Sequence, residues 1–419
     1  MSDVGSRIRR LVARSREQVV VAALVGVVTG LAVAGFERLT VNVVFDRGVA
    51  HFPLWLLAVT PGLGLAVATL WLRRVGHGVT PATADEYIGS FHDGRPLRLA
   101  DLVHRVVGAV ATLGSGGAMG LEGPSIYIGA TFGSLVQQRF GTRLRSMDRN
   151  VLLVAGAAAG IAAIFKAPAT GAIFAIEVPY QEDLARRTLL PALVGGATGY
   201  LGLVAINGTV PLFPIHGAPP FSFVDLTGAA ALGLAAALCA RAFAWLLHRA
   251  KDFAAGANPV VGVVGAGASI AVLFAIGRGL TGQSLVLTPG YSVVTWALDP
   301  KHGIALLLAV LVLRCLATGA TVAGGGVGGL FVPLVVAGAL LGRAFAGALG
   351  QADTSLFLVV GIAAFLGAGY RVPLAAVMFV AEATGRPGFV VPGLIAAVVA
   401  ELVMGDVSVT TYQVRPKAT

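Results

Sequence analysis

Long stretches without any Asp, Glu, Lys or Arg constrain the fold of this chain more than any other feature. They include residues 106–121, 188–224, 253–277, 315–342 and 354–370. Each is near or above the roughly 20 residues that a helix needs to span a bilayer. Charged residues make up only 12% of the chain and its mean hydropathy is +0.85, whereas soluble domains carry about 25% charged residues. The sequence therefore predicts an all-α polytopic membrane protein.

The N-terminal segment predicts the orientation of the chain. Five arginines cluster ahead of the first apolar run: Arg7, Arg9, Arg10, Arg14 and Arg16. The positive-inside rule places such a cluster in the cytoplasm, and we expect residues 1–18 to form an amphipathic surface helix there. The run at 19–36 is too long for a signal-peptide core and lacks a clear cleavage site, so it predicts a retained helix. We expect a plasma (inner) membrane protein with both termini cytoplasmic.

The net charge of +10 does not indicate a nucleic-acid partner. The basic residues lie in short connections, such as Arg143 with Arg145, and not in a patch with interleaved aromatic residues. Membrane topology explains this distribution better. Cys239 and Cys315 each lie in an apolar run without metal-ligating neighbours, so we expect packing residues and no disulfide, metal site or cofactor.

The chain contains an internal repeat. Residues 154–177 align without gaps to residues 359–382, with eight identities in 24 positions, including Pro168 with Pro373 and Glu177 with Glu382. Upstream, an offset of 209 pairs Pro124 with Pro333 and Glu122 with Phe331. Duplicated halves in transporters are often inverted, with broken helices meeting near the membrane midplane.

The repeat predicts one transmembrane domain over residues 19–413, followed by a short tail at 414–419. Its halves cover about residues 20–206 and 225–405, and the proline-rich segment 207–224 predicts a loop between them. The glycine-rich segments at 114–117 and 324–329 are the expected breaks in the helices.

Each glycine-rich break leads to a proline, Pro124 or Pro333, which is well tolerated at the first position of a helix. We therefore expect two helices that begin inside the membrane. A helix N-terminus offers unpaired N–H groups and a partial positive charge, which suit a small anion.

Glu122 is the only Asp, Glu, Lys or Arg between Arg105 and Arg139. An acid within a membrane span is energetically costly and usually marks an ion or proton pathway. Beside a helix start, its carboxylate can act as a tethered anion that occupies the site until protonation or a competing ion displaces it. The alternative is a structural glutamate that caps a helix.

Four motifs, taken in order, resemble those of the CLC chloride channel and transporter family. Gly120-Leu121-Glu122-Gly123-Pro124 resembles its GREGP motif, and Gly329-Leu330-Phe331-Val332-Pro333 is similar to its GxFxP motif. Phe165-Lys166-Ala167-Pro168 resembles its FNAP segment, and Gly369-Tyr370-Arg371-Val372-Pro373 falls at the second-half counterpart. The resemblance covers about residues 20–413.

The resemblance implies a homodimer with one pore in each subunit, built from an inverted repeat of tilted and broken transmembrane helices. Glu122 would be the gating residue and the possible proton carrier. Segments 168–182 and 373–383 would contribute to the dimer interface, and no nucleotide-binding pair is expected after Thr419. The expected anion-binding residues are His77, Gly78, Gly123, Leu330, Phe331 and Tyr412.

The first anion motif of the family departs most from its usual form. It corresponds to Gly76-His77-Gly78-Val79-Thr80-Pro81 here, so His77 replaces an anion-coordinating serine. An imidazole N–H can donate to an anion, and a protonated ring would bind it more tightly at low pH. The alternative is a surface-loop histidine without a ligand.

Other departures concern a basic residue and the proton route. Leu121 replaces the family arginine, and Lys166 replaces an asparagine, either pairing with a nearby acid or lining an entrance. Val178 occupies the position of the internal acid found in proton-coupled members. Glu177 precedes it, but the repeat supplies Glu382 at the same place in the other half, which favours a scaffold role for both acids.

The central tyrosine of the family has two candidates in the C-terminal segment. Matching the serine and glutamine of similar tails selects Thr410, and matching by residue type selects Tyr412. Tyr412 is preferred because a phenolic O–H is a better single donor.

The predicted function is transmembrane transport of a small inorganic anion, chloride first, across the lipid bilayer, with protons as a possible second substrate. A fluoride exporter or fluoride/proton antiporter of the same fold is the alternative, because fluoride-exporting members also lack the usual serine. A remote alternative is an intramembrane enzyme that uses Ser115. No histidine occurs between His104 and His216 to activate it.

Overall fold

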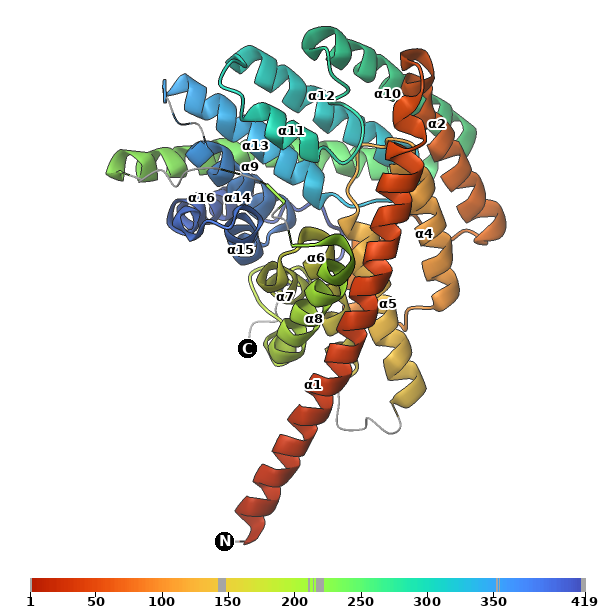
Figure 1. The fold of residues 1–419 in the computed structure, drawn as a ribbon, viewed down its shortest axis with the longest axis vertical. Helices are drawn as coiled ribbons and strands as arrows, with labels where there is room; N and C mark the ends of the chain where they lie inside the picture. The colour runs from red at the N-terminus through yellow and green to blue at the C-terminus, as the bar shows by residue number, and fades with distance from the viewer. Residues whose placement is uncertain are drawn as a thin grey trace.

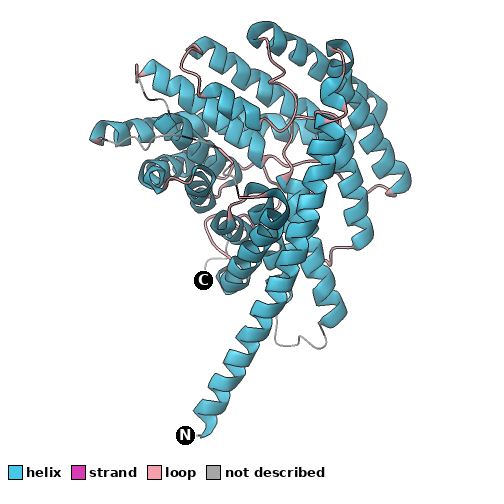
Figure 2. Cartoon of the chain, in the orientation of Figure 1, coloured by secondary structure: helices cyan, strands magenta, loops and turns pink. Residues whose placement is uncertain are grey.

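The computed structural model describes residues 2–141, 148–209, 212–213, 215, 222–351, 353 and 355–415, with side chains from Arg16 onward. This part of the chain folds into sixteen α-helices joined by turns and short helical segments, without a β-strand (Figures 1 and 2). Within these residues, eight helical segments are long and apolar enough to cross a membrane.

The first half contains α1 (Ser2–Glu37), α2 (Leu54–Leu70), α3 (Ala84–Asp93), α4 (Leu99–Gly114), α5 (Glu122–Phe140), α6 (Arg149–Phe165), α7 (Pro168–Glu177) and α8 (Leu189–Asn207). The second contains α9 (Phe223–Gly256), α10 (Pro259–Thr281), α11 (Tyr291–Ala297), α12 (Ile304–Ala323), α13 (Phe331–Ala348), α14 (Ser355–Tyr370), α15 (Pro373–Thr384) and α16 (Val390–Met404). The charge-free stretches fall largely on these helices and on the breaks between them.

Two of the predicted segments, the N-terminal surface helix and the C-terminal tail, lie partly outside the described residues. The surface helix expected over residues 1–18 continues into the first span as the single helix α1, and its amphipathic character concerns side chains 1–15, outside the described ones. Residues 416–419 of the expected tail also lie outside the described part. Among the described residues of segment 207–224, Phe213 and Ile215 are buried, so the joint between the halves packs into the core.

The two halves repeat the same packing of neighbouring helices. Helices α5 and α6 cross where Gly129 faces Gly156, and α13 and α14 cross where Gly338 faces Gly361. A Cβ atom at Gly129 or Gly338 would collide with the facing carbonyl oxygen. In the alignment of the halves, Gly129 is equivalent to Gly338 and Gly156 is equivalent to Gly361. The repeat is therefore present in the packing as well as in the sequence.

The connection from α6 to α7 is repeated in the connection from α14 to α15. Lys166 (φ 53°) follows the last residue of α6 and Arg371 (φ 58°) follows the last residue of α14, and both have a left-handed backbone conformation. Pro168 and Pro373 then begin α7 and α15 at a first helical position, where the missing N–H is not needed. The same turn chemistry therefore reverses the chain in each half.

Two glutamates join the halves reciprocally. Glu177, at the end of α7, accepts hydrogen bonds from the Leu374 and Ala375 amides of α15, at 3.0 and 2.8 Å. Glu382, in α15, accepts from the Ala169 and Thr170 amides of α7, at 2.9 and 2.7 Å. Such reciprocal contact of equivalent residues is what a two-fold axis between the halves produces. Both acids thus make the contacts between the halves that the predicted scaffold role requires.

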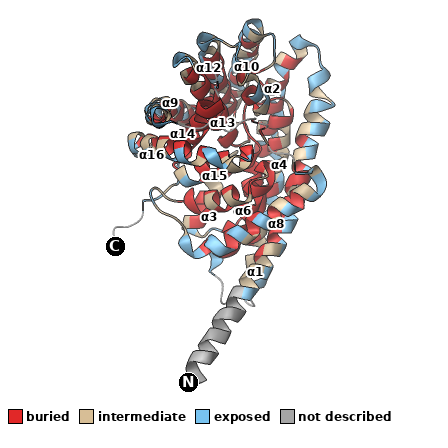
Figure 3. Cartoon of the chain, turned by 60° about the vertical axis from the view of Figure 1, so that its left-hand side comes forward, coloured by how far each residue is buried: buried red, intermediate tan, exposed pale blue. Residues whose placement is uncertain are grey.

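The most deeply buried helices form the centre of the molecule. Figure 3 shows α6, α13 and α14 largely buried, and every residue of α14 is buried. Outer helices such as α1 and α10 expose apolar side chains, among them Leu24 and Val264, at 62% and 63% exposure. In a membrane protein these faces meet lipid, and the buried helices hold the paired breaks described next.

Candidate functional site

The two predicted helix breaks meet at the centre of the fold. Helix α4 ends at Gly114 and α5 begins at Glu122, whereas α12 ends at Ala323 and α13 begins at Phe331. The intervening loops are joined by an antiparallel bridge, in which Gly120 and Gly329 exchange N–H···O bonds of 2.9 and 2.7 Å. Since these two residues are equivalent in the repeat, the bridge brings both helix starts to one place.

The sequence predicted each proline at the first position of its helix, but each stands at the third. Helix α5 begins at Glu122 and α13 at Phe331, two residues before Pro124 and Pro333. The first N–H groups of any helix lack an intrahelical acceptor, so proline is tolerated here too. This correction places Glu122 and Phe331 inside the first turns, with their amides at the helix starts.

Glu122 bridges the two helix starts. Its side chain is fully buried, and Oε1 accepts a hydrogen bond of 2.6 Å from the Phe331 amide. Oε2 has no hydrogen-bond partner among the described residues. The carboxylate therefore accepts a hydrogen bond from the Phe331 amide, which was expected to bind the anion, as the tethered-anion hypothesis requires.

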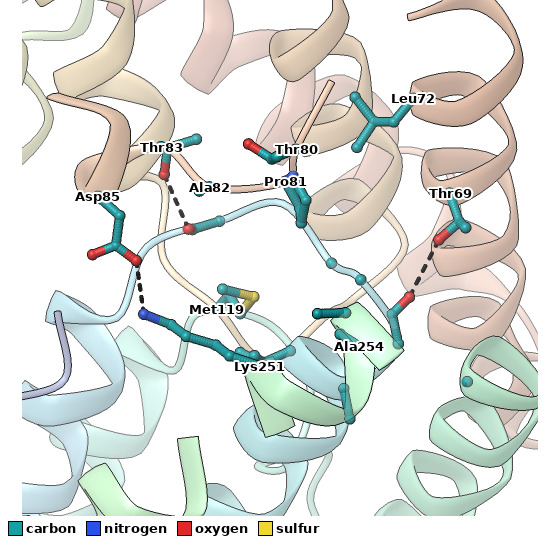
Figure 4. A pocket seen from close by; sticks show the side chains of 18 of the residues that line it. Thr69, Leu72, Thr80, Pro81, Ala82, Thr83, Asp85, Met119, Lys251 and Ala254 are labelled. Atoms are coloured by element: carbon teal, nitrogen blue, oxygen red, sulfur yellow. Dashed lines mark hydrogen bonds and ion pairs between the residues drawn. The ribbon is translucent and has the colours of Figure 1, made fainter. Parts of the chain in front are cut away.

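A cavity of about 930 Å³ (Figure 4) lies next to Glu122, whose carboxylate packs against Gly329 in the cavity wall. It is lined by the loop after α2, the break before α13, the end of α9 and the C-terminal segment. Of the expected anion-binding residues, it brings together His77, Gly78, Leu330 and Tyr412. Gly123 and Phe331 are buried with Glu122 and do not line it.

His77 lies in an exposed turn of the cavity wall. It and Gly78 have left-handed backbone conformations, with φ of 50° and 85°, and both are exposed. The Gly78 amide donates to the Leu72 carbonyl at 3.0 Å. His77 therefore reaches the cavity, but from its exposed margin and not from among the buried residues around Glu122.

The two candidates for the central tyrosine occupy different environments. Tyr412 is 51% exposed, whereas Thr410 is 7% exposed and its hydroxyl lies 3.0 Å from that of Ser408. Both residues line the cavity. Tyr370, which the sequence analysis did not propose, also lines it and is 2% exposed. The buried phenol in this cavity therefore belongs to α14 and not to the C-terminal segment.

Thr83 is a second residue that sequence reasoning missed. It precedes α3, is buried, and donates from Oγ1 to the Gly328 carbonyl at 3.3 Å (Figure 4). A Cβ atom at Gly123 would collide with this hydroxyl, so Thr83 lies directly beside the start of α5. The sequence could have pointed to Thr83, because it follows by two residues the motif at 76–81 that was expected to bind an anion.

Arg105 holds the loop that carries Thr83. The buried guanidinium donates to the Ala82 and Thr80 carbonyls at 2.7 and 3.1 Å. It also donates to the Tyr127 hydroxyl at 2.7 Å and forms an ion pair with Glu86 at 3.3 Å. A buried arginine with this many acceptors positions a loop firmly, although the sequence marked it only as the boundary of an apolar stretch.

Lys166 and Leu121 are the other departures, and each is next in sequence to a residue of the site. The Phe165 ring packs on Phe331, with centroids 4.3 Å apart, so Lys166 follows a neighbour of the residue whose amide binds Glu122. Its ammonium interacts electrostatically with Glu37 at the end of α1, which fits the predicted pairing with an acid. Leu121 is buried as the residue before α5.

Paired intramembrane helix starts, with a buried carboxylate between them, define a transporter built on inverted repeats and broken helices. A family model described as voltage gated chloride channel matches residues 65–405. The chain belongs to this family, and the predicted family resemblance is confirmed.

Relatives match along nearly the whole chain. The H(+)/Cl(-) exchange transporter ClcA of Citrobacter koseri is 28% identical over 427 residues, covering 95% of this chain and 88% of the relative. The protein of the same name from Salmonella arizonae is also 28% identical, with the same coverage.

Solved structures share the fold. A CLC-type fluoride/proton antiporter superposes with a TM-score of 0.81 at 21% identity, covering 96% of this chain and 98% of that chain. A slow cyanobacterial Cl-/H+ antiporter superposes with a TM-score of 0.80 at 23% identity, covering 92% and 94%. The expected architecture, an inverted repeat of broken transmembrane helices, is confirmed.

Proposed function

We propose that this protein transports small inorganic anions across the membrane, with chloride as the principal substrate and Glu122 as the gate. The observation that carries the proposal is the 2.6 Å hydrogen bond between Glu122 Oε1 and the Phe331 amide. A carboxylate oxygen and a halide compete for the same N–H donor. The buried acid thus closes the anion site by occupying it.

Opening requires the carboxylate to leave the amide. Protonation removes its negative charge and weakens a charge-assisted hydrogen bond, and an arriving anion can take its place. We assign the anion to the amides of Leu330 and Phe331 at the start of α13, beside the Gly123 backbone and the Tyr370 hydroxyl. Amides and hydroxyls without a full cation bind an anion weakly enough to release it.

Proton coupling is expected to be weak. Val178 is 1% exposed and apolar, so it cannot relay a proton. Both carboxylate oxygens of the adjacent Glu177 are hydrogen-bonded to α15, which commits this acid to the scaffold. The relatives are named proton/chloride exchange transporters, and this chain is proposed to share their anion transport with less proton movement.

The remaining assignments concern assembly and orientation. We place the N- and C-termini in the cytoplasm, in the plasma membrane, on the basis of the N-terminal arginines. A homodimer through segments 168–182 and 373–383 would also bury the apolar residues that the neighbouring helices α8 and α16 expose, including Leu190 at 51% and Leu402 at 78%. Catalysis is not proposed, because no histidine between His104 and His216 could activate Ser115, whose hydroxyl donates to the Thr112 carbonyl at the end of α4.

Flux from reconstituted vesicles tests the function directly. Vesicles loaded with chloride should release it at a protein-dependent rate, with proton movement well below one per anion, and vesicles loaded with fluoride provide the comparison. Fluoride release more than about tenfold faster than chloride release would assign the protein to fluoride export instead. Absence of flux for both anions would refute anion transport.

A further inference from the structure

The cavity beside the gate contains an ion pair that the gating mechanism does not use. Lys251, near the end of α9, extends across the cavity wall to Asp85 in the first turn of α3 (Figure 4). Its Nζ lies 2.7 Å from Asp85 Oδ2 and 2.9 Å from the Val409 carbonyl oxygen. Both residues line the cavity, together with the Gly328–Leu330 stretch that leads to the anion site.

The Lys251 ammonium has an unused donor. An ammonium carries three N–H groups, and Asp85 and Val409 are its two acceptors in the part of the chain that the structure describes. The Lys251 and Asp85 side chains are 26% and 14% exposed. The ammonium is thus neither deeply buried nor freely solvated, and its third N–H is available to a small anion in the cavity.

Asp85 moderates this positive charge. Its second oxygen, Oδ1, accepts from the Thr411 amide at 3.3 Å, which anchors the carboxylate to the C-terminal segment. A lone cation in contact with an anion attracts it strongly, because the effective dielectric near a protein surface is well below that of water. Transport requires binding that is weak enough for release, and a fixed neighbouring carboxylate offsets much of this attraction.

We propose that Lys251 forms a second anion-binding position in the cavity, and that Asp85 is the built-in competitor that keeps anion binding there weak. An anion entering from this side first binds the free donor of Lys251 and then passes Gly328 and Gly329 to the gate at Glu122. This inference rests on the proposed function, because it assigns the route by which the same anion reaches the same site.

The two members of the pair make opposite predictions. Lys251→Gln removes the attraction and should raise the apparent KM for chloride flux by about tenfold. Asp85→Asn leaves Lys251 unopposed and should lower that KM several-fold, while slowing maximal flux because the anion is released more slowly. A pair that only anchors the C-terminal segment would shift KM in the same direction in both variants.

The experiment measures chloride flux from vesicles, and chloride binding to the purified protein by calorimetry, for the wild type and both variants. Lys251→Arg retains the charge and should stay within about twofold of wild type. Asp252→Asn is the matched control, because Asp252 lines the same cavity next to Lys251 without an ion pair to it. It should also change KM by less than about twofold.

Opposite shifts of KM in Lys251→Gln and Asp85→Asn support the second binding position. Shifts in the same direction, or no shift in Lys251→Gln while wild-type flux is intact, overturn it and leave the proposed function standing. A wild-type protein that carries no anion would refute the proposed function itself. If Asp85→Asn does not yield folded protein, an unchanged KM in Lys251→Gln alone overturns the inference, since Lys251→Arg controls for folding.

Discussion

Glu122 and Glu177 are both buried glutamates that accept hydrogen bonds from the start of a helix in the other half, yet their environments differ. Both oxygens of Glu177 are bonded to amides of α15, and Glu382 mirrors this arrangement on α7. Only one oxygen of Glu122 is bonded, and the other has no partner among the described residues. A fully satisfied acid fixes two helices together, whereas a half-satisfied acid beside a cavity can leave.

The repeat explains why Glu122, and not Glu177, suits the proposed role of a gate. Glu177 and Glu382 are equivalent, so each half supplies the same cap to the other. Glu122 is equivalent to Phe331, so only one half supplies the titratable group and the other supplies the amide that binds it. Equivalent positions thus carry the same residue in the scaffold contact, Glu177 with Glu382, but different residues at the proposed gate, Glu122 with Phe331.

The largest loss of folded protein is expected from substitutions at the crossings of α5 with α6 and of α13 with α14. Gly129→Leu forces a side chain against the Gly156 backbone, and overpacking of this kind costs 1–3 kcal/mol or more, so little folded protein should be recovered. Gly338→Leu should fail equally, since Gly361 occupies the same position in the second half. Size-exclusion chromatography in detergent measures the recovery.

Gly265→Leu provides the control for these crossings. Gly265 lies in α10 with no atom near the position of a Cβ, so its variant should be recovered like the wild type. Normal recovery of Gly129→Leu but not of Gly338→Leu would contradict the equivalence of the two halves.

Loss of a scaffold glutamate should come next in magnitude. Glu177→Ala leaves two amides at a buried helix start without their acceptor, and hydrogen bonds to charged groups contribute roughly 1.5–3 kcal/mol each. The free energy of unfolding should fall by about 3 kcal/mol, and Glu382→Ala should have a similar effect. Denaturant titration in detergent checks both variants, and added chloride should not restore either one.

A smaller, chloride-dependent change is expected for Glu122→Ala. The vacated Phe331 amide becomes available to chloride, so unfolding should become harder by up to about 1.4 kcal/mol for each tenfold rise in chloride once binding sets in. The wild type should show a shallower dependence because its own carboxylate competes. Equal chloride dependences in the wild type and this variant would argue against competition for one amide.

The smallest effect is expected at the left-handed turn after α6. Lys166 adopts φ of 53°, a conformation that asparagine tolerates better than lysine does. Lys166→Asn should therefore change the free energy of unfolding by no more than about 1 kcal/mol, because lost interaction with Glu37 offsets part of the gain. A loss of several kcal/mol, measured by the same denaturant titration, would show that the Lys166 side chain is a major contact.

Much of this architecture could be predicted from the sequence because it is encoded locally or by repetition. Charge-free stretches indicated the spans, glycine runs indicated the breaks, and the shared Glu177 and Glu382 indicated a scaffold role. The position of Glu122 beside a helix start followed from the same motifs. The helix starts themselves differed by two residues, because proline is acceptable throughout the first turn and does not define the first position.

The side chains that complete the cavity could not be predicted in this way. Lys251 meets Asp85 and Thr83 meets Gly328 across long sequence separations, and the fold alone brings them together. Tyr370 illustrates the same limit, since a search for a phenol near the C-terminus selects Tyr412, which is half exposed. Local patterns identify the backbone donors of the site, whereas tertiary packing selects its side chains.

Anion flux as a function of pH, compared between the wild type and Glu122→Gln in reconstituted vesicles, tests the central claim most directly. The glutamine mimics a protonated gate, so the variant should carry chloride at least as fast as the wild type and at the same rate across the pH range. Wild-type flux should rise as the pH falls, because protonation releases the Phe331 amide. A Glu122→Gln variant whose flux keeps the wild-type pH dependence would contradict the assignment of Glu122 as the gate.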